Sequence, residues 1–527
     1  MIQGDGRMKD LTSGIYSFED LIQGNFLYVD KTEYIWQLIR PAKGLYFFSR
    51  PRRFGKSLTL STLKAVFQGK KDLFKGLAIY DKPYDWKTYP IIHLSFADYN
   101  VVSNAKDELP DYLMTKVRRI ADEYSIRLPD NTPANCFGFL IDEIYKKSKV
   151  VILVDEYDKP ILSNITDPEV GEILNCLKGF YSVLKDRNEQ ERLLFVTGVS
   201  KFCHVSLFSG LNNLTDITMD ARYATMLGYT QAEFESNFRE QIDAASQKLG
   251  MPKEELLPEI KAWYDGFRFH AGSESVYNPV SLAKFFESGG EFSNYWFETG
   301  TPKFLVELAK NQNFDFESAL DEPVPGIAFS AFEIDNIDPL TLLFQTGYVT
   351  IRGTVRKLGE TWYHLDFPNR EVSGSFNAYL LNRYSGKTQT EVVKFSAELT
   401  AALDNGDVKR LRKAMEVFFA GISYEIHHKN ESNFQNIFFA LFRLLGISIK
   451  AESRTNDGRI DAVAETDQFV FIFVFKLDND GSALSQIKEK QYYKQYELSR
   501  KKIFLNGVTF DTQTGQIADW QTEEVSS

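Results

Sequence analysis

Residues 49–57 read Ser-Arg-Pro-Arg-Arg-Phe-Gly-Lys-Ser, and they follow the short apolar stretch Leu45–Phe48. A run with leucine at helical spacing begins directly after them, at Leu58. An apolar stretch of strand length, a loop containing proline and glycine, and a helical pattern predict the order strand, loop, helix. In that order the Gly-Lys-Ser at 55–57 falls where the loop passes into the helix, which is the position of a phosphate-binding loop.

The residues at the end of this loop suit the binding of a nucleotide. Gly55 lets the backbone amides curve around phosphate oxygens, Lys56 reaches the terminal phosphates, and Ser57 offers its hydroxyl to Mg²⁺. The general pattern also has glycine six positions before the lysine, where this chain has Arg50. Taken alone, the segment could also be an ordinary turn between a strand and a helix. On the functional interpretation the nucleotide-binding segment further includes Arg53, Phe54 and Leu58.

A second buried strand ends in acidic residues. The apolar run Val150–Val154 is followed by Asp155 and Glu156. Ligands of open α/β sheets bind at the carboxyl ends of the strands, so we expect Asp155 to lie beside the loop and hold Mg²⁺. Glu156 would orient or deprotonate an attacking water. Two solvated acids at the end of a strand are the alternative, but the upstream Gly-Lys-Ser makes it weaker, and the combination predicts ATP and Mg²⁺ as cofactors.

A third apolar run, Leu193–Val196, ends at Thr197. If this strand lies between the other two, the Thr197 hydroxyl would sense the terminal phosphate. A threonine at the end of a strand is also common where it has no functional role. Arg52 and Arg53 in the loop could neutralise phosphate charge, and Arg222 or Arg268 could act from the lid as an arginine finger or second sensor. A surface salt bridge is the alternative for each of the four.

The composition is that of a globular chain. Of the 527 residues, 43% are hydrophobic and 25% are charged, which argues against disorder, collagen-like repeats and coiled coils. Lysine plus arginine number 61 and aspartate plus glutamate 72, a net charge of −11. The chain as a whole therefore does not predict a nucleic-acid-binding surface, and any such contact must be local.

The cysteines and the N-terminus indicate the compartment. Cys136, Cys176 and Cys203 are widely spaced and odd in number, which argues against a disulfide framework and against a zinc site. The first ten residues lack the apolar region of a signal peptide, and no apolar run is long enough to span a bilayer. We therefore expect a cytoplasmic protein with no membrane partner.

The chain is long enough for three or four structural units at roughly 150 residues each. Alternating apolar strands and helical patterns predict an α/β domain with a parallel sheet at 1–222. A helical, aromatic region at 223–300 would form a lid, and 301–424 would contain a small winged-helix-like unit and a helical linker. A compact α/β domain then covers 425–527.

Several of these segments carry a resemblance to a known family. Over roughly residues 10–300 the chain resembles the prokaryotic AAA-ATPase-like family of P-loop NTPases, in which arginine at the position of Arg50 is the usual form of the loop. The resemblance implies that Tyr28–Thr32 lies near the nucleotide. It also implies a C-terminal domain of the PD-(D/E)XK nuclease superfamily, which has a restriction-endonuclease-like α/β fold. The segments that carry it are Tyr28–Thr32, Arg50–Ser57, Val154–Pro160, Thr197–Phe202 and Ser209–Asn213.

The C-terminal sequence has the element order of that nuclease core. Its chemistry needs an aspartate on one strand and, on the next, an acid two residues before a lysine, because alternation then places the carboxylates on one face, where they bind a metal ion. Asp461, as metal ligand, and Lys476, which helps to activate water, match as catalytic residues, but the third position holds Val474. The elements are a helical pattern from 431, strands near 447–451, 458–463 and 469–475, a second helical pattern and a strand at 503–505.

Val474 decides what this domain can do. Valine cannot ligate Mg²⁺, so the sequence predicts a disabled or severely weakened metal site. Glu431, Glu452 or Asp478 could supply the missing carboxylate. Otherwise the domain is a degenerate nuclease fold retained for binding nucleic acid or protein.

Three functions remain open. The first is a Mg²⁺-dependent ATP-binding and ATP-hydrolysing protein whose nucleotide state controls a degenerate nuclease-like domain. The second is an active, ATP-gated, metal-dependent nuclease of DNA or RNA, and the third is a nucleotide-dependent adaptor with little turnover. ATP is the expected partner in all three, DNA or RNA would bind through the C-terminal domain, and a homo-oligomer is compatible with each.

Overall fold

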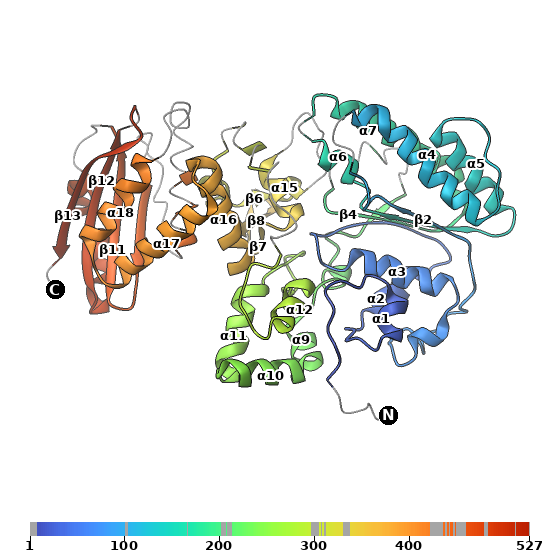
Figure 1. Ribbon diagram of the computed structural model, residues 1–527, viewed down its shortest axis with the longest axis horizontal. Coiled ribbons are helices and arrows are strands. Elements are labelled where there is room, and N and C mark those ends of the chain that lie inside the picture. Colours follow the sequence, from blue (N-terminus) through green and yellow to red (C-terminus); the bar gives the residue numbers. More distant parts are fainter. Residues whose placement is uncertain are drawn as a thin grey trace. The chain divides into compact units, whose positions relative to one another are not determined.

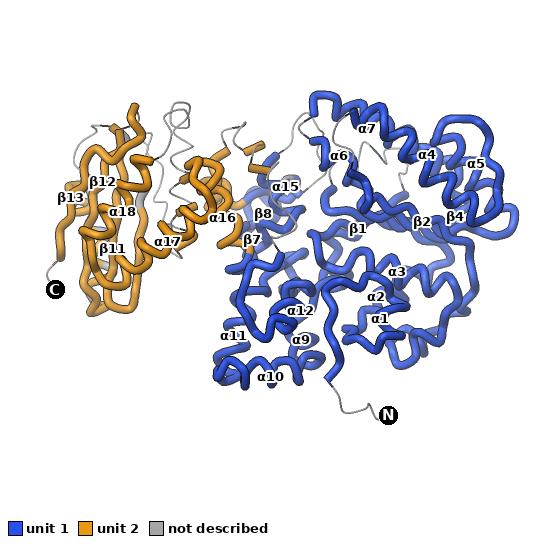
Figure 2. The backbone as a smooth tube through the Cα atoms, viewed as in Figure 1, with its two compact units in different colours: residues 1–300, 324–371 blue, residues 301–323, 372–527 orange. Residues whose placement is uncertain are grey.

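The computed structural model describes residues 8–525 apart from 101–103, 166, 202–206, 208–212, 297–304, 307, 310–311, 313, 330–337, 422–435, 438–439, 442, 446–447, 450–459, 479–482 and 512. The chain forms two compact units (Figure 2): the first holds residues 1–300 and 324–371, and the second holds 301–323 and 372–527. The boundary between them therefore falls inside the region expected at 301–424, and the finer division into four domains stays a prediction.

A five-stranded parallel sheet forms the centre of the first unit, as predicted. Its strand order is β2-β3-β4-β1-β5. Every residue of β3 and β4 is buried, as expected for strands covered on both faces. The bounds are β1 Gly44–Ser49, β2 Ile91–Ser95, β3 Val150–Asp155, β4 Glu191–Gly198 and β5 Thr215–Asp216.

Two layers of helices cover this sheet. In Figure 1, α4, α5 and α7 lie on one face, and α1, α2 and α3 lie on the other. α3 begins at Lys56, directly after the loop, so the order strand, loop, helix is the one predicted. The bounds are α1 Phe18–Gln23, α2 Thr32–Ile39, α3 Lys56–Phe67, α4 Ala105–Glu123, α5 Pro133–Tyr145, α6 Lys159–Ser163 and α7 Val170–Ser182, with 3₁₀ turns η1 Lys71–Phe74, η2 Lys185–Gln190 and η3 Ala221–Tyr223.

Four further helices follow the sheet, and we refer to α9–α12 as the lid. A capping box starts α9: the Glu233 N–H donates to Thr230 Oγ1 at 3.2 Å, and the Thr230 N–H donates to Glu233 Oε2 at 2.8 Å. The lid helices share one largely aromatic core, which includes Phe234, Phe238 and Phe285. The bounds are α9 Gln231–Asn237, α10 Arg239–Leu249, α11 Lys253–Tyr264 and α12 Pro279–Glu287.

Residues 324–371 complete the first unit. The helix α15 precedes an antiparallel hairpin of β7 and β8, and β6 pairs with β8. A helix followed by such a hairpin is compatible with the predicted winged-helix-like unit, which stays a prediction. α16 begins in the first unit and continues into the second. The bounds are β6 Val324–Pro325, η5 Gly326–Phe329, α15 Pro339–Thr346, β7 Thr350–Lys357, β8 Glu360–Asp366 and α16 Arg370–Ser385.

The second unit contains a mixed five-stranded sheet of order β13-β12-β11-β10-β9. β11 and β12 are parallel and are connected through α21, whereas the other neighbours are antiparallel. This arrangement agrees with the predicted restriction-endonuclease-like α/β domain. The bounds are α14 Phe316–Asp321, α17 Gln389–Asp404, α18 Val408–Ala420, β9 Ser448–Ile449, β10 Ile460–Glu465, β11 Phe469–Leu477, α21 Ala483–Lys490, η7 Tyr492–Ser499, β12 Lys502–Asp511 and β13 Gln516–Val525.

Alternation along β11 gives its two faces different neighbours. Val470, Ile472 and Val474 pack in one apolar cluster with residues of α21. On the opposite face aromatic rings pack together, with ring centroids 5.2 Å apart for Phe471 and Phe504 and 6.2 Å apart for Phe475 and Phe510. β11 is thus buried on both faces, which explains its continuous apolar sequence.

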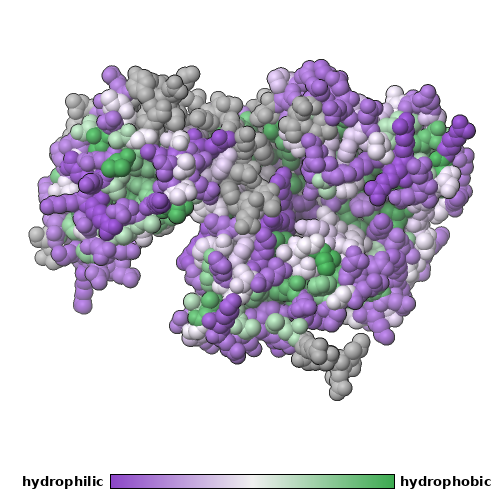
Figure 3. Space-filling view, in the orientation of Figure 1, coloured by the Kyte–Doolittle hydropathy of each residue, from purple (hydrophilic) through white to green (hydrophobic). Residues whose placement is uncertain are grey.

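Within the described ranges, none of the helices combines the length and the apolar character needed to cross a membrane. α4 has 19 residues, but charged side chains such as Lys116 and Arg118 interrupt it. The face of the molecule in Figure 3 is mostly polar, with apolar residues gathered in small patches.

β4 begins with a buried acid. This acid, Glu191, lies at the amino end of the parallel strands, away from the loop at 50–55 that follows the carboxyl end of β1. Glu191 is fully buried, and neither carboxylate oxygen has a hydrogen-bond partner among the described residues. Burial raises the pKa of Glu191 from 4.5 to about 8, and the charge of Lys43 opposes this effect. Because the folded protein holds this proton more tightly than the unfolded chain, the contribution to stability is complete below pH 4.5 and is lost as the pH rises through 8.

We expect Glu191→Gln to remove this pH dependence. At pH 5 the melting temperature of the variant should lie close to that of the unaltered protein, and at pH 9 it should be about 2 °C or more higher. Thermal unfolding followed by circular dichroism from pH 5 to 9 measures the difference. Glu189→Gln, at an exposed neighbouring position, is the control and should change nothing. A difference that is the same at every pH would contradict titration of Glu191 in this range.

Candidate nucleotide-binding site

The loop at 50–55 connects β1 to α3, and its last residue must be glycine. Gly55 has a φ of +95°, in the left-handed region, and a Cβ placed there would meet no atom within 4 Å. The backbone conformation, rather than a lack of room, therefore requires glycine. No described side chain caps α3, so the first N–H groups of this helix are available to an anion in the open space beside Gly55.

Lys56 and Ser57 start α3 and contact different partners. The Lys56 Nζ donates to the carbonyls of Arg50 and Pro51, both at 2.9 Å. The Ser57 Oγ donates to Asp155 Oδ2 at 2.6 Å. Burial lowers the pKa of Lys56, and the charge of Asp155 opposes this effect. These contacts hold the ammonium group against the loop and the Ser57 hydroxyl against the tip of β3.

The tips of three strands meet at this loop because β4 lies between β1 and β3. Two buried oxygens there have no hydrogen-bond partner among the described residues: Asp155 Oδ1, at the end of β3, and Thr197 Oγ1, in β4. Burial raises the pKa of Asp155, against the hydrogen bond from Ser57 and the charge of Lys56. Buried oxygens without partners are costly. Hydrated Mg²⁺ and a terminal phosphate have the chemistry to satisfy them, so this donor set fits both.

Glu156 follows Asp155 with a strained backbone. Its φ of +52° lies in the left-handed region, which is uncommon for glutamate. The side chain is 33% exposed, and its Oε2 lies 3.5 Å from the Lys159 Nζ. Strain of this kind is concentrated at functional sites. The carboxylate is thus accessible to water beside the tip of β3, as a general base needs to be.

Asp158 is a residue of this region that the sequence analysis did not identify. Its buried carboxylate accepts hydrogen bonds from the Val199 and Ser200 N–H groups, at 3.1 and 2.8 Å, and from the Ser200 hydroxyl at 2.8 Å. Burial raises the pKa of Asp158, and these hydrogen bonds oppose it. Asp158 therefore ties the turn after β3 to the segment that follows Thr197. Its place within Val154–Pro160 was the signal available in the sequence.

Arg50, which replaces the glycine of the general pattern, is an internal brace. Only 1% of the residue is exposed. Its guanidinium donates to the carbonyls of Thr218 and Tyr223, at 2.6 and 3.1 Å, and lies 4.3 and 4.0 Å from the ring centroids of Phe48 and Phe269. Burial lowers the pKa of Arg50 to about 9, and the side chain still carries its charge at neutral pH. Arg50 thus fixes the start of the loop to the segment after β5 and to the segment after α11.

The tip of the loop is held by residues that follow α12. The Arg53 guanidinium donates to the Tyr295 carbonyl, and the Trp296 Nε1 donates to the Arg52 carbonyl at 3.2 Å. The Trp296 N–H in turn donates to a carboxylate oxygen of Glu371 at 2.6 Å. Burial raises the pKa of Glu371 to about 7. The backbone of the loop and the start of α16 are therefore linked through Trp296.

The described contacts of the other two candidate arginines lie away from the loop, and the buried Arg268 Nε has no hydrogen-bond partner among the described residues. Arg222 is largely exposed and forms an ion pair with Asp220 at 2.6 Å. Arg268 donates its backbone N–H to Thr350 Oγ1 at 2.7 Å. The described contacts bring neither guanidinium to the loop.

An apolar pocket opens beside the loop. Four predicted site residues line it: Arg53, Phe54, Gly55 and Leu58. Tyr28 and Val29 line it from the N-terminal segment, and Met226 and Tyr229 line it from the segment before α9. The Tyr28–Thr32 segment thus contributes to a pocket that is continuous with the loop.

The C-terminal site is only partly within the described residues. Asp461 lies in β10 opposite Val474 of β11, but its side chain is outside the described part. Val474 is fully buried in the cluster under α21, and Lys476 is also buried. Of the three acids that could replace the missing one, Glu431 and Glu452 lie outside the described residues. Asp478 is exposed just after β11, where its N–H donates to the Phe510 carbonyl at 2.7 Å.

Comparisons with known proteins match two separate segments of the chain. Residues 12–208 match the family described as predicted AAA-ATPase, and residues 429–520 match the PD-(D/E)XK nuclease superfamily. A protein of Azotobacter chroococcum mcd 1, described as an uncharacterized protein in the vnfD 5′ region, is 37% identical over 536 residues, which cover 98% of this chain and 99% of that protein. The chain therefore belongs to the AAA-ATPase-like family and carries a PD-(D/E)XK nuclease superfamily domain at its C-terminal end.

Proposed function

We propose that this protein binds ATP together with Mg²⁺ and hydrolyses it. The observation that carries the proposal is the 2.6 Å hydrogen bond between the Ser57 hydroxyl and Asp155, beside two buried oxygens of Asp155 and Thr197 that have no partner among the described residues. In P-loop proteins, nucleotide-bound Mg²⁺ is held by the hydroxyl at the start of the helix after the phosphate-binding loop and by a carboxylate at the tip of a nearby strand.

Each residue has a role that follows from its chemistry. Lys56 exchanges the two loop carbonyls for phosphate oxygens, because a charged partner gives an ammonium group the stronger hydrogen bonds. Ser57 and Asp155 hold the Mg²⁺, which when bound offsets the negative charge of the phosphates. Glu156 takes a proton from the attacking water, and Thr197 donates its hydroxyl hydrogen to the terminal phosphate.

The apolar pocket supports a nucleoside as the rest of the ligand. It adjoins Gly55, where the phosphates would lie, and it is lined by Tyr28, Val29, Leu58 and Tyr229. A planar base gains from burial against such apolar and aromatic side chains. The site thus has an anion-binding part and an apolar part side by side, as a nucleotide requires.

We further infer that the nucleotide state controls a C-terminal domain that has lost nuclease activity. Val474 supports this inference, because it packs in an apolar cluster at the position where a metal ligand is needed. The second candidate function is an active ATP-gated nuclease of DNA or RNA. The register that sets Asp461 opposite Val474, two residues before Lys476, favours it, because two of the three expected side chains are present on adjacent strands.

The ATPase proposal predicts different effects for Lys56→Ala and Glu156→Gln. Loss of the Lys56 ammonium should weaken ATP binding about 100-fold or more, because it removes a charge that contacts the phosphates. Glu156→Gln should leave the Kd for ATP within about threefold and lower kcat about 100-fold or more, because only the proton acceptor is lost. Isothermal titration and phosphate release measure the two quantities.

Lys64→Ala, on the last turn of the same helix, is the control for a change of charge on α3 and should alter neither quantity. Unchanged turnover in both site variants would rule out this ATPase site. Binding without turnover in the unaltered protein, together with a nucleotide-dependent change of oligomer size, would instead support the adaptor function.

Restoring the glycine of the general loop pattern should harm this protein. Arg50→Gly removes the guanidinium that two buried carbonyls and two aromatic rings contact, at a cost of about 3 kcal/mol or more. We expect a lower melting temperature and weaker ATP binding. Arg127→Gly, at an exposed position of the loop between α4 and α5, is the control and should change neither quantity. If Arg50→Gly binds ATP as tightly as the unaltered protein does, Arg50 is not needed to hold the loop in its binding conformation.

If the C-terminal domain is a disabled nuclease whose state follows the bound nucleotide, the unaltered protein should not cleave nucleic acid. Single- and double-stranded DNA and RNA should stay intact with Mg²⁺ or Mn²⁺, with and without ATP, while ATP is turned over. Val474→Glu should introduce cleavage, and Mg²⁺ should raise the melting temperature of this variant, because the new carboxylate completes a metal site.

Ile472→Glu is the matched control, since Ile472 packs in the same cluster as Val474 but does not pair with Asp461. It should show neither cleavage nor stabilisation by Mg²⁺. Cleavage by the unaltered protein that is lost in Asp461→Ala would favour the active nuclease instead.

A further inference from the structure

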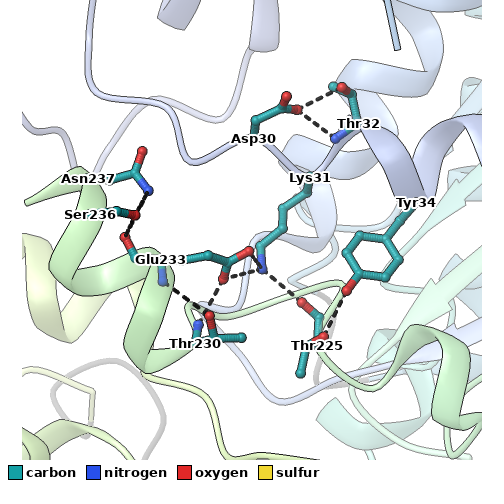
Figure 4. Close-up of polar contacts among 9 residues, drawn as sticks. All are labelled: Asp30, Lys31, Thr32, Tyr34, Thr225, Thr230, Glu233, Ser236 and Asn237. Atoms are coloured by element: carbon teal, nitrogen blue, oxygen red, sulfur yellow. Dashed lines mark hydrogen bonds and ion pairs between the residues drawn. The ribbon is translucent and has the colours of Figure 1, made fainter. Parts of the chain in front are cut away.

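The segment Tyr28–Thr32 contains charged residues that the proposed chemistry does not use. Asp30 fixes the segment to its own side of the pocket (Figure 4): its Oδ1 accepts from the Thr32 N–H at 2.8 Å and from the Thr32 hydroxyl at 2.7 Å. The Asp30 Oδ2 accepts from the Ala78 N–H at 2.7 Å, and Thr32 Oγ1 accepts from the Ile79 N–H at 3.1 Å. Asp30 and Thr32 therefore hold the start of α2 in place and leave Lys31 to reach in another direction.

Lys31 reaches the lid. Its Nζ donates to both carboxylate oxygens of Glu233, at 2.7 and 2.6 Å, and to the Thr225 carbonyl at 2.8 Å. Figure 4 shows the lysine extending from the N-terminal segment to Glu233 at the start of α9. A second contact joins the same parts of the chain, because Tyr34 Oη and Thr225 Oγ1 lie 2.8 Å apart.

The ion pair is shielded from solvent. The side chains of Lys31 and Glu233 are 12% and 28% exposed. Burial lowers the pKa of Lys31, and the charge of Glu233 opposes this effect. Three hydrogen bonds satisfy the ammonium group, so removal of Glu233's charge leaves a poorly hydrated cation, which costs more than breaking a surface pair.

The pair also borders the pocket. Lys31 lines the apolar pocket beside Gly55, together with Tyr28 and Val29 of its own segment and Gly228 and Tyr229 of the segment that leads into α9. Two stretches that are about two hundred residues apart in the sequence thus meet over the pocket through this pair. A ligand in the pocket would leave more easily if these two stretches separated.

We propose that the Lys31–Glu233 ion pair is a latch that holds the lid against the N-terminal segment and sets the rate at which nucleotide leaves the pocket. The proposal rests on the proposed binding of ATP. Lys31 is a positioning residue: it belongs neither to the loop at 50–55 nor to the strand tips that carry Asp155, Glu156 and Thr197. The latch therefore acts on release and not on hydrolysis of nucleotide already bound.

Two single variants test the latch. Lys31→Met removes the charge, and Glu233→Gln removes the opposite charge while keeping a residue that can still complete the capping box of α9. In each, ATP labelled with a fluorophore on its ribose should dissociate about fivefold or more faster than from the unaltered protein in stopped-flow chase experiments. In Glu233→Gln, whose side chain is not among those that line the pocket, the rate constant of single-turnover hydrolysis should stay within about twofold, because the catalytic groups are untouched.

The double variant separates a shared contact from two unrelated effects. If both residues act through one ion pair, Lys31→Met combined with Glu233→Gln should release nucleotide no faster than either single variant. Glu33→Gln is the matched control, because Glu33 lies directly after this segment, in the first turn of α2, and pairs with Lys82 at 2.6 Å near the surface. It should leave the dissociation rate unchanged.

The outcomes separate the latch from the proposed function. If the unaltered protein does not retain ATP, or if Lys56→Ala retains ATP as well as the unaltered protein does, the proposal of ATP binding at this site is wrong, and the latch proposal is wrong with it. If the unaltered protein retains ATP and Lys56→Ala does not, dissociation at the unaltered rate from Lys31→Met and Glu233→Gln overturns the latch alone. Should Lys31→Met not fold, as judged by thermal unfolding without nucleotide, Glu233→Gln decides, since it keeps the helix cap.

Discussion

The position of β4 between β1 and β3 is the constraint on which the candidate site depends. Backbone pairing sets Ser49 beside Gly198, and Val154 beside Val196, so the three strands end at the same level. Both faces of these strands are buried, so a slip by one residue would disturb the packing on both faces and would move a polar residue at the end of a strand, such as Asp155, toward the core. The register that satisfies the core is therefore also the register that brings the loop, the acids after β3 and the threonine of β4 together.

Much of this arrangement could be predicted from the sequence because its signals are local. Continuous apolar runs that stop at polar residues predicted β1, β3 and β4 to within a few residues, and the Gly-Lys-Ser at 55–57 predicted where α3 begins. Apolar runs also predicted β9 to β12 of the C-terminal sheet, whereas β13 was missed because its sequence is mostly polar and exposed. The role of each side chain at the site stays a prediction. What no local pattern contained was the set of partners. The carbonyls that accept from Arg50 lie about 170 residues away along the chain, and the backbone N–H groups that donate to Asp158 lie about 40 residues away.

The buried polar groups around the loop differ in how far protein partners satisfy their hydrogen bonds. Arg50 and Asp158 each form several hydrogen bonds with backbone groups, which stabilises the fold, although the Arg50 Nε has no hydrogen-bond partner among the described residues. Asp155 and Thr197 each keep one buried oxygen that has no partner in the part of the chain that the structure describes. Protein partners for these two oxygens would make the protein without ligand more stable. Without such partners, a bound ligand can supply the missing interactions, so stability is exchanged for ligand binding.

The path of the chain between the two units has a consequence for how they can be separated. Residues 301–323 belong to the second unit, yet residues 324–371 return to the first. A fragment that ends at residue 300 lacks Thr350, which accepts the Arg268 N–H, and Glu371, which holds Trp296 under the loop. A fragment that starts at residue 301 carries those residues without their partners. No single cut in the chain yields both units intact. The ATPase-like and nuclease-like parts therefore cannot be exchanged as separate modules through one fusion point.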